Sequence, residues 1–230
     1  MSANEAIVLA GGFGTRLRSV VEQLPKPLAP VAGRPFVAWV LDHLAGQGIE
    51  RVVMATGYLA KMVESALGDS WHGMDLAYSV EVEPLGTGGA IALARTMVTG
   101  EGVHVVNGDT YLRYSPGAMV ELVTPNGADM AMALAEVDDV SRYGAVSSAA
   151  GRVVAFSEKG QSGPGYINAG CYYLGAATLA ALPVGQRFSF ENDVLMPGAV
   201  HGRVAAYTET SGFIDIGVPE DFHRAQAIFR

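Results

Sequence analysis

Short apolar segments alternate with longer segments of helical length through the first half of the chain. The apolar segments are rich in β-branched residues, which predicts strands. The predicted strands are residues 5–10, 51–56, 75–80 and 103–109, and the predicted helices between them are residues 36–45, 59–67 and 88–97. This alternation is typical of β-α-β units around a largely parallel sheet, whose buried strands are apolar on both faces.

After about Gly127 the pattern changes to strands with little helix between them. The predicted strands are residues 129–137, 143–148, 152–158, 166–174 and 203–208, and the predicted helices are residues 176–182, 191–195 and 219–229. The last helix has Pro219 in its first turn, and Glu220 and Asp221 suit its positive end. We therefore expect one α/β domain over residues 1–230, with antiparallel or mixed strands added to a Rossmann-like, mostly parallel sheet flanked by helices.

Composition excludes several classes of partner. The net charge of −8 argues against a nucleic-acid or anionic-membrane surface, although a few local cations still allow an anionic small substrate. No apolar run approaches the roughly 18 residues of a membrane span, and the N-terminal residues do not resemble a secretory signal. The single cysteine, Cys171, fits a reducing compartment and a place in the core. We expect a cytoplasmic protein.

The stretch "LAGGFGTRL" follows the first predicted strand, at the sheet edge where open α/β folds bind ligands. Gly11, Gly12 and Gly14 permit positive φ and close backbone approach, and Arg16 can hold phosphate oxygens. A Rossmann fingerprint does not fit, since Leu17 stands where its third glycine belongs. No phosphate-binding Walker A pattern fits either. On these residues alone, a plain glycine turn with a surface arginine remains the alternative.

Lys26 lies between Pro25 and Pro27. The prolines fix φ on either side and favour extended geometry for Lys26, so a flexible amine is carried on a stiff segment. An ordinary surface lysine does not need such support, whereas a lysine whose amine must contact one particular phosphate oxygen does.

Together, "LAGGFGTRL" and "PKPLAPVAGRPF" resemble the signature of the sugar-1-phosphate nucleotidyltransferases. The resemblance implies transfer of a nucleotidyl group from a nucleoside triphosphate to a sugar 1-phosphate. It implies catalytic roles for Arg16, on the departing phosphates, and for Lys26, on the phosphate under attack. It assigns nucleotide binding to Leu9, Ala10, Gly11, Gly12, Gly14 and Thr15. It also implies a nucleotide-binding half over about residues 1–126 and a sugar-binding, metal-completing half over about residues 127–230.

The segment "EVEPLGTGGA" joins a predicted strand to a predicted helix. The resemblance places it beside the nucleobase and gives nucleotide-binding roles to Gly88 and Glu83. An ionised Glu83 carboxylate could accept hydrogen bonds from the N1–H and N2–H₂ of guanine. The alternative is a capped helix start, with Thr87 as the N-cap.

Two aspartates end apolar segments. Asp109 follows the strand "VHVVN", and Asp215 lies between Ile214 and Ile216. The resemblance implies that both hold Mg²⁺, with Asp109 also in the nucleotide site, and two carboxylates suit the coordination of this ion. We expect Lys26 to converge on the same cleft. An Asp-x-Gly turn is the structural alternative at Asp215.

The resemblance assigns four residues to the sugar 1-phosphate. Glu158 would bind sugar hydroxyls, Lys159 the phosphate, Gly144 would offer backbone groups, and Asn168 its amide. Because neighbours on a strand face opposite sides, Glu158 and Lys159 share a pocket only if the strand ends or bulges there. An ordinary solvated charge pair is the alternative.

Along most of its length the chain looks most like the D-glycero-α-D-manno-heptose 1-phosphate guanylyltransferases. This likeness implies GTP and the heptose 1-phosphate as partners, GDP-heptose for bacterial surface polysaccharide as product, and a possible homo-oligomer. The alternatives are a mannose 1-phosphate guanylyltransferase, an N-acetylmuramate 1-phosphate uridylyltransferase, a glucose 1-phosphate thymidylyltransferase, and a non-catalytic nucleotide-sugar sensor. Intact Arg16, Lys26, Asp109 and Asp215 argue against the sensor.

Overall fold

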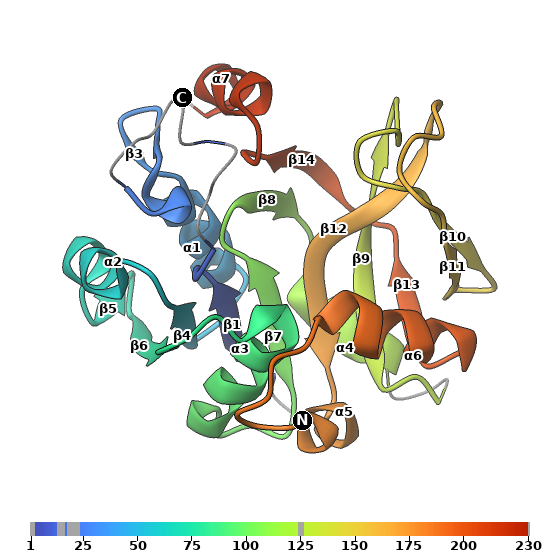
Figure 1. Ribbon diagram of the computed structural model, residues 1–230, viewed down its shortest axis with the longest axis horizontal. Coiled ribbons are helices and arrows are strands. Elements are labelled where there is room, and N and C mark those ends of the chain that lie inside the picture. Colours follow the sequence, from blue (N-terminus) through green and yellow to red (C-terminus); the bar gives the residue numbers. More distant parts are fainter. Residues whose placement is uncertain (1–2, 13–16, 18–23, 124–126, 230) are drawn as a thin grey trace.

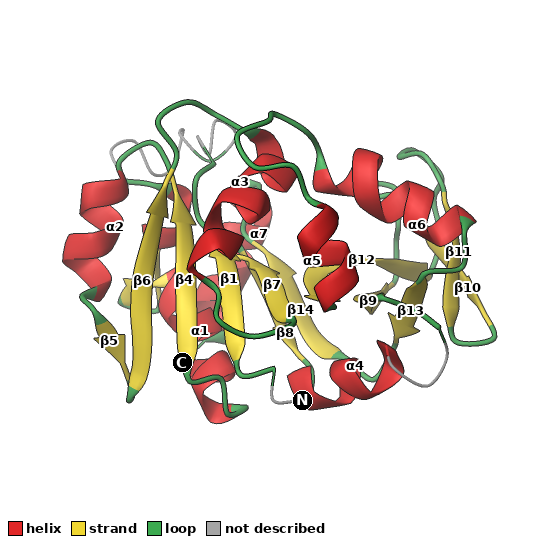
Figure 2. Cartoon of the chain, turned by 90° about the horizontal axis from the view of Figure 1, so that it is seen from below, coloured by secondary structure: helices red, strands yellow, loops and turns green. Residues whose placement is uncertain are grey.

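The computed structural model describes residues 3–12, 17, 24–123 and 127–229, and it arranges them as a central sheet with helices on both faces (Figures 1 and 2). The strands are β1 (Glu5–Leu9), β2 (Pro30–Val31), β3 (Arg34–Pro35), β4 (Arg51–Thr56), β5 (Ser70–Trp71), β6 (Met74–Val80), β7 (Val103–Asn107), β8 (Thr110–Arg113), β9 (Met130–Val137), β10 (Val146–Ala149), β11 (Arg152–Phe156), β12 (Gly165–Leu174), β13 (Val204–Tyr207) and β14 (Ser211–Asp215). The helices are α1 (Phe36–Gly46), α2 (Ala60–Leu67), α3 (Gly86–Ala94), α4 (Pro116–Val123), α5 (Ala176–Ala181), α6 (Met196–Val200) and α7 (Pro219–Ile228), with short 3-10 helices η1 (Lys26–Leu28) and η2 (Arg95–Met97) and a π-helix η3 (Glu191–Leu195).

The main sheet combines the two pairing modes that the sequence predicts. Its strand order is β10-β11-β13-β9-β12-β7-β1-β4-β6-β5. Strands β7, β1, β4 and β6 pair in parallel. Strand β12 is antiparallel to both β7 and β9, and β13 runs parallel to β9. The predicted mixed, mostly parallel α/β sheet is confirmed for the strands that carry the first half.

Both faces of the sheet are buried, as its apolar strands require. In β1, Ala6 and Val8 belong to the core that α1, α2, α4 and α7 cover, while Ile7 belongs to the core under α3, α5 and α6. All three side chains are inaccessible to solvent. Strand β1 therefore has a fixed position in the middle of the fold, and the loop that follows it leaves from the carboxyl edge of the parallel strands.

A small second sheet was not predicted from the sequence. Strand β8 begins three residues after Asn107, the last residue of β7, and pairs with β14 so that Asp215 lies opposite Thr110. The amide of Ile216 donates to the carbonyl of Asp109 at 3.1 Å. This pairing brings the ends of two segments far apart in the sequence together. Helix α4, which lies before Gly127, was also not predicted.

The expectation of an extended Lys26 is wrong. Lys26 begins the 3-10 helix η1, which is closed by hydrogen bonds from the Leu28 amide to the Pro25 carbonyl (2.8 Å) and from the Ala29 amide to the Lys26 carbonyl (3.0 Å). Pro27 sits in the first turn, where its missing N–H leaves no helical bond unmade. Pro27 and Leu28 are buried, so tertiary packing fixes the segment.

Helix α7 lies against the segment that follows Lys26 (Figure 1). The Gln226 side chain accepts from the Ala32 amide at 2.8 Å and donates to the Pro30 carbonyl at 2.7 Å. The Phe229 ring stacks on Trp39 of α1, with 4.8 Å between ring centroids. The C-terminal helix is thus attached to the N-terminal third of the chain. Among the helices of the described ranges, none combines the length and apolar character needed to cross a bilayer.

Candidate active site

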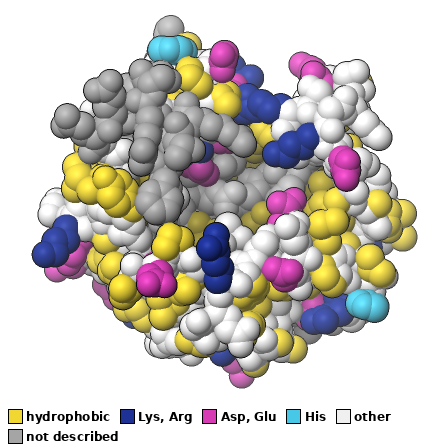
Figure 3. Space-filling model, in the orientation of Figure 1, with side chains coloured by type: hydrophobic (Ala, Val, Ile, Leu, Met, Phe, Trp, Pro, Cys, Tyr) yellow, Lys and Arg dark blue, Asp and Glu magenta, His cyan; other side chains and the backbone are white. Residues whose placement is uncertain are grey.

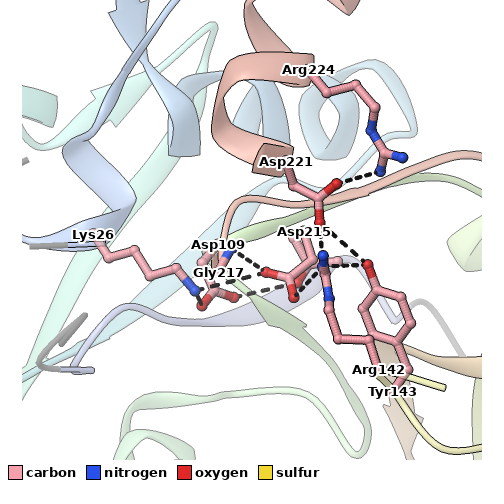
Figure 4. Close-up of polar contacts among 9 residues, drawn as sticks. Lys26, Asp109, Arg142, Tyr143, Asp215, Gly217, Asp221 and Arg224 are labelled. Atoms are coloured by element: carbon pink, nitrogen blue, oxygen red, sulfur yellow. Dashed lines mark hydrogen bonds and ion pairs between the residues drawn. The ribbon is translucent and has the colours of Figure 1, made fainter. Parts of the chain in front are cut away.

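One ammonium group is shared by two carboxylates at the carboxyl edge of the sheet (Figure 4). The Lys26 Nζ forms a direct ion pair with Asp109 Oδ2 and lies 3.7 Å from Asp215 Oδ1. The Lys26 side chain is only 14% exposed. The structure therefore brings together the cation and the two acidic residues that the sequence singled out, as expected.

The carboxylates of Asp109 and Asp215 are each positioned by the end of a different strand. Asp109 follows the end of β7, and Asp215 ends β14. The Gly217 amide donates to Asp215 Oδ1 at 2.7 Å, so the Asp-x-Gly turn proposed as the structural alternative is present. The turn orients the carboxylate and does not remove it from Lys26. The turn is therefore compatible with the functional interpretation of Asp215, which stays a prediction.

The carboxyl group of Asp215 is held in an unfavourable environment for its charge. Burial raises its pKa above the usual value, and the nearby charge of Asp109 raises the pKa further. The Lys26 ammonium, the Gly217 amide and the Arg142 guanidinium oppose this shift without cancelling it. A carboxylate that gains from any added positive charge is suited to accept a cation.

Arg142 lies on the other side of Asp215, where the structure adds a group that the sequence did not single out. Its Nη2 atom forms a direct ion pair with Asp221 and lies 3.7 Å from Asp215 Oδ2. Burial, the largest single influence, lowers the pKa of the Arg142 guanidinium, but the hydrogen bond to Asp221 and the nearby charges of Asp221 and Asp215, with Tyr143, together raise the pKa above its usual value. Burial also raises the pKa of the neighbouring Tyr143 to about 12, so its hydroxyl stays protonated at neutral pH.

A cavity of about 310 Å³ opens beside Asp109. Leu9, Ala55 and Ala90 give it apolar walls, and Glu81, Asn107 and Asp109 add polar groups. Apolar walls with a few placed polar groups suit a flat ligand with a charged end. Figure 3 shows acidic and basic side chains around the hollow in the middle of this face.

A family model described as nucleotidyl transferase matches residues 5–230. The chain belongs to this family. It is 41% identical over 222 residues to a D-glycero-α-D-manno-heptose 1-phosphate guanylyltransferase from Aneurinibacillus thermoaerophilus, covering 96% of each chain. It is 36% identical over 228 residues to a mannose-1-phosphate guanylyltransferase from Mycobacterium tuberculosis, covering 97% of this chain and 64% of the relative. Among solved structures, HddC from Yersinia pseudotuberculosis complexed with GMP-PN is similar, with a TM-score of 0.86 and 35% identity, over 98% of this chain and 99% of that one.

The acidic pair of this nucleotidyltransferase fits a divalent cation. A cationic group, the Lys26 ammonium, already contacts both carboxylates, which shows that the two face a common point. Their oxygens are the ligand type that Mg²⁺ prefers. Within the described ranges, no group of three or more His, Cys, Asp or Glu side chains is arranged so that it could hold a metal ion. Two carboxylates suit Mg²⁺ when substrate phosphates supply further ligands.

The glycine-rich loop is described only in part. The Ala10 amide donates to the Ala55 carbonyl at 2.7 Å, which extends the pairing of β1 with β4. Gly11 and Gly12 line the cavity, but neither has positive φ, so the expected conformational reason for glycine is wrong at both. A Cβ on Gly11 would lie 3.5 Å from Glu81 Oε1, an ordinary van der Waals contact, so packing within the described residues does not require glycine there. Gly14, Thr15 and Arg16 lie outside the described residues.

Besides Asp109, the cavity is lined by the carboxylate of Glu81, which the sequence did not single out. Glu81 is half-buried, whereas Glu83 is exposed and does not line the cavity. The Leu85 amide donates to Glu81 Oε2 at 2.8 Å. Burial raises the pKa of Glu81, and the Leu85 amide partly opposes that shift. The assignment of base contacts to Glu83 remains a prediction, and Glu81 is better placed for the role.

Gly88 has a packing reason to be glycine. A Cβ there would lie 2.2 Å from the Phe188 ring, and the Gly88 amide already donates to the Phe188 carbonyl at 3.1 Å. The Thr87 N-cap is wrong, because α3 begins at Gly86 and the Thr87 hydroxyl instead accepts from the Phe190 amide at 3.0 Å. The nucleotide contact assigned to Gly88 stays a prediction.

On the predicted sugar side, the structure brings three of the four residues into neighbouring turns. Strand β11 ends at Phe156, so exposed Glu158 and Lys159 lie in the turn after it, as their shared role requires. Gly144 has φ +86°, and its amide donates to the Val140 carbonyl at 2.9 Å. A Cβ at Gly144 would lie 2.6 Å from the Ser157 carbonyl oxygen.

Asn168 lies on β12 beside the irregularity between residues 168 and 172. Its Oδ1 accepts from the Gly170 amide at 3.0 Å, so the amide stabilises the bulge. Cys171, in the same strand, is buried and free, and burial raises its thiol pKa to about 12. The expectation that Cys171 is a core residue is confirmed.

Proposed function

We propose that this nucleotidyltransferase joins GTP and D-glycero-α-D-manno-heptose 1-phosphate to give GDP-heptose and pyrophosphate. The observation that carries the proposal is the convergence of Lys26 with Asp109 and Asp215 beside a cavity of nucleobase size. The choice of GTP and heptose is supported by the relative of that name, which matches over 96% of each chain. The similarity to HddC in its complex with GMP-PN supports a guanine nucleotide.

The proposed reaction is an in-line displacement. An oxygen of the sugar 1-phosphate attacks the α-phosphorus of GTP, the bond to the β-phosphate oxygen breaks, and pyrophosphate leaves with the electron pair. The attacking phosphate is already ionised at neutral pH, so no protein base is required. Catalysis then consists mainly of positioning and of neutralising charge between two anions.

Side chains of this chain supply most of that neutralisation. Lys26 would leave the carboxylates to bind the phosphate under attack, and Arg16 would bind the departing phosphates. Asp109 and Asp215 would hold Mg²⁺, which when bound screens the phosphate charges and orients them. Glu81 would accept hydrogen bonds from the N1–H and N2–H₂ of guanine. Gly144, Glu158, Lys159 and Asn168 would form the sugar side.

Pyrophosphate release with Mg²⁺ tests the proposal. Four nucleoside triphosphates are paired with heptose, mannose, glucose and N-acetylmuramate 1-phosphates. Turnover only with GTP and the heptose 1-phosphate is the expected result. Nucleotide binding without turnover on any pair would contradict an enzymatic function and favour a sensor.

A mannose 1-phosphate guanylyltransferase is the second candidate. The relative from Mycobacterium tuberculosis supports it at 36% identity, although the chain spans only 64% of that protein. Efficient turnover of mannose 1-phosphate in the same panel would decide for it. With either sugar we propose a cytoplasmic enzyme without a membrane partner that supplies a nucleotide sugar for bacterial surface polysaccharide and can assemble as a homo-oligomer.

A further inference from the structure

Arg142 is placed unequally between two carboxylates. The same nitrogen, Nη2, is in direct contact with Asp221 Oδ2 and stands 3.7 Å from Asp215 Oδ2 (Figure 4). The guanidinium also lies over the Tyr143 ring, 4.4 Å from its centroid. Arg142 therefore pairs mainly with Asp221, although Asp215 is close enough to form an ion pair with the same guanidinium.

Asp221 is a buried carboxylate that the proposed reaction does not use. Its side chain is 7% exposed and lies in the first turn of α7. Arg224 Nη2 lies 2.9 Å from its Oδ1, and the Tyr143 hydroxyl donates to its Oδ2 at 3.5 Å. A buried charge is tolerated only when it is well paired, and Asp221 is paired with Arg142 at Oδ2 and with Arg224 at Oδ1.

Asp221 is supported by contacts of helix α7 that do not involve the Asp215 side chain. Helix α7 is held by the two Gln226 hydrogen bonds to the segment after Lys26 and by the stacking of Phe229 on Trp39. Asp221 is thus a carboxylate held in place by its helix, and it competes with Asp215 for the guanidinium of Arg142.

We propose that Asp221 is a positioning residue that holds the Arg142 guanidinium away from Asp215 and so keeps Asp215 available to a divalent cation. This rests on the proposed role of Asp215 as a metal-binding carboxylate. Without Asp221, Arg142 closes the 3.7 Å gap and forms a short, charge-assisted pair with Asp215 Oδ2. Lys26 already lies near Oδ1, so both oxygens of Asp215 would then face a cation.

The test is Mn²⁺ binding to the nucleotide-free protein, measured by electron paramagnetic resonance. We expect Asp221→Asn to bind Mn²⁺ about tenfold more weakly than wild type, since a charge-assisted pair must now be broken. Arg142→Gln removes the competitor and binds at least as tightly as wild type. The double variant D221N/R142Q binds like R142Q, which a loss of folding cannot mimic. Arg224→Gln, which leaves the Arg142–Asp221 contact in place, changes affinity less than threefold.

Two results would overturn the proposal: wild-type affinity in D221N, or weakened binding in R142Q. If D221N does not fold, R142Q and the double variant still test whether Arg142 competes with the metal. If the guanidinium instead supported the metal site, its removal would weaken Mn²⁺ binding in both variants. Asp215→Asn serves as the reference. If that variant retains wild-type Mn²⁺ binding, the metal role of Asp215 fails, and with it the proposed function of the pair, independently of Asp221.

Discussion

Lys26 stands where two carboxylates would share a metal ion, and its removal should therefore have opposite effects on metal binding and on turnover. Lys26→Met keeps the length of the apolar stem and removes the charge. In the free protein the ammonium contacts Asp109 and lies 3.7 Å from Asp215, so it competes with any other cation for this place. Near 4 Å, two unit charges interact by about 1 kcal/mol in water and about 4 kcal/mol at an effective dielectric constant of 20.

The side chains of the pair are partly exposed, 14% for Lys26 and 27% for Asp215, so a value between these limits applies. About 2 kcal/mol corresponds to roughly a 30-fold change in a dissociation constant. We expect K26M to bind Mn²⁺ about 30-fold more tightly than wild type when no nucleotide is present. The same variant should lose about 10²–10³ in kcat, because the positive charge on the phosphate under attack is gone.

Both readouts use one set of proteins. Mn²⁺ titration followed by electron paramagnetic resonance gives the metal affinity, and pyrophosphate release at saturating substrates gives kcat. Lys61→Met is the matched control, since Lys61 is exposed on α2, and it should change neither quantity. Unchanged Mn²⁺ affinity in K26M would refute competition at the carboxylates. An unchanged kcat with a raised KM would refute a role in the transition state.

Three further predictions follow from single contacts. Glu81→Gln should lower kcat/KM for GTP by about 10–100-fold, the effect of a lost hydrogen bond to a charged group, whereas Glu83→Gln should not; the reverse result would restore the base role to Glu83. Gly144→Ala should lower Tm more than Gly151→Ala, because both have positive φ (+86° and +73°) but only the first Cβ meets a backbone oxygen; equal losses would show that φ strain alone acts. Asp215→Asn should raise Tm at pH 8 by about 2–4 °C, as about 1 kcal/mol does at this chain length. The pKa of Asp215 is higher in the folded than in the unfolded protein, so the folded state favours the neutral carboxyl group. The protein therefore keeps its full stability below the unfolded pKa of Asp215, and it loses stability as the pH rises through the folded pKa, where the buried carboxyl group must ionise. The difference from wild type should vanish near pH 3.5, and a lower Tm at pH 8 would contradict this.

The parallel part of the fold could be predicted because its strands are apolar on both faces and regularly spaced. The convergence of Lys26, Asp109 and Asp215 could be expected from the signature. The pairing that creates it could not, since β8 and β14 are four and five residues long and join segments about a hundred residues apart. Neither strand has enough length for a periodic signal, and only the tertiary fold shows that Asp215 lies opposite Thr110.

The choice between Glu81 and Glu83 shows a second limit. Residues two apart on a strand share a face, so periodicity cannot separate them. The structure does, because the Glu81 amide still pairs with the Thr56 carbonyl at 2.8 Å, while Pro84 follows Glu83 directly and the chain turns. The role of Asp221 could not be read from the sequence either. A carboxylate in the first turn suits the positive end of any helix, and its ion pair with Arg142 depends on packing that the sequence does not reveal.

The polar network in Figure 4 is balanced before any substrate arrives. Among the described side chains drawn there, three cationic groups face three carboxylates, and every carboxylate has a cationic neighbour. Two anionic substrates and a divalent ion would change the partners of these groups without leaving any charge unpaired in a partly buried site. Unpaired charge is what such a site tolerates least. Under the proposed function, exchange of partners would let Asp109 and Asp215 receive the metal as Lys26 moves to phosphate, which would account for the position of the ammonium between these two carboxylates in the free protein.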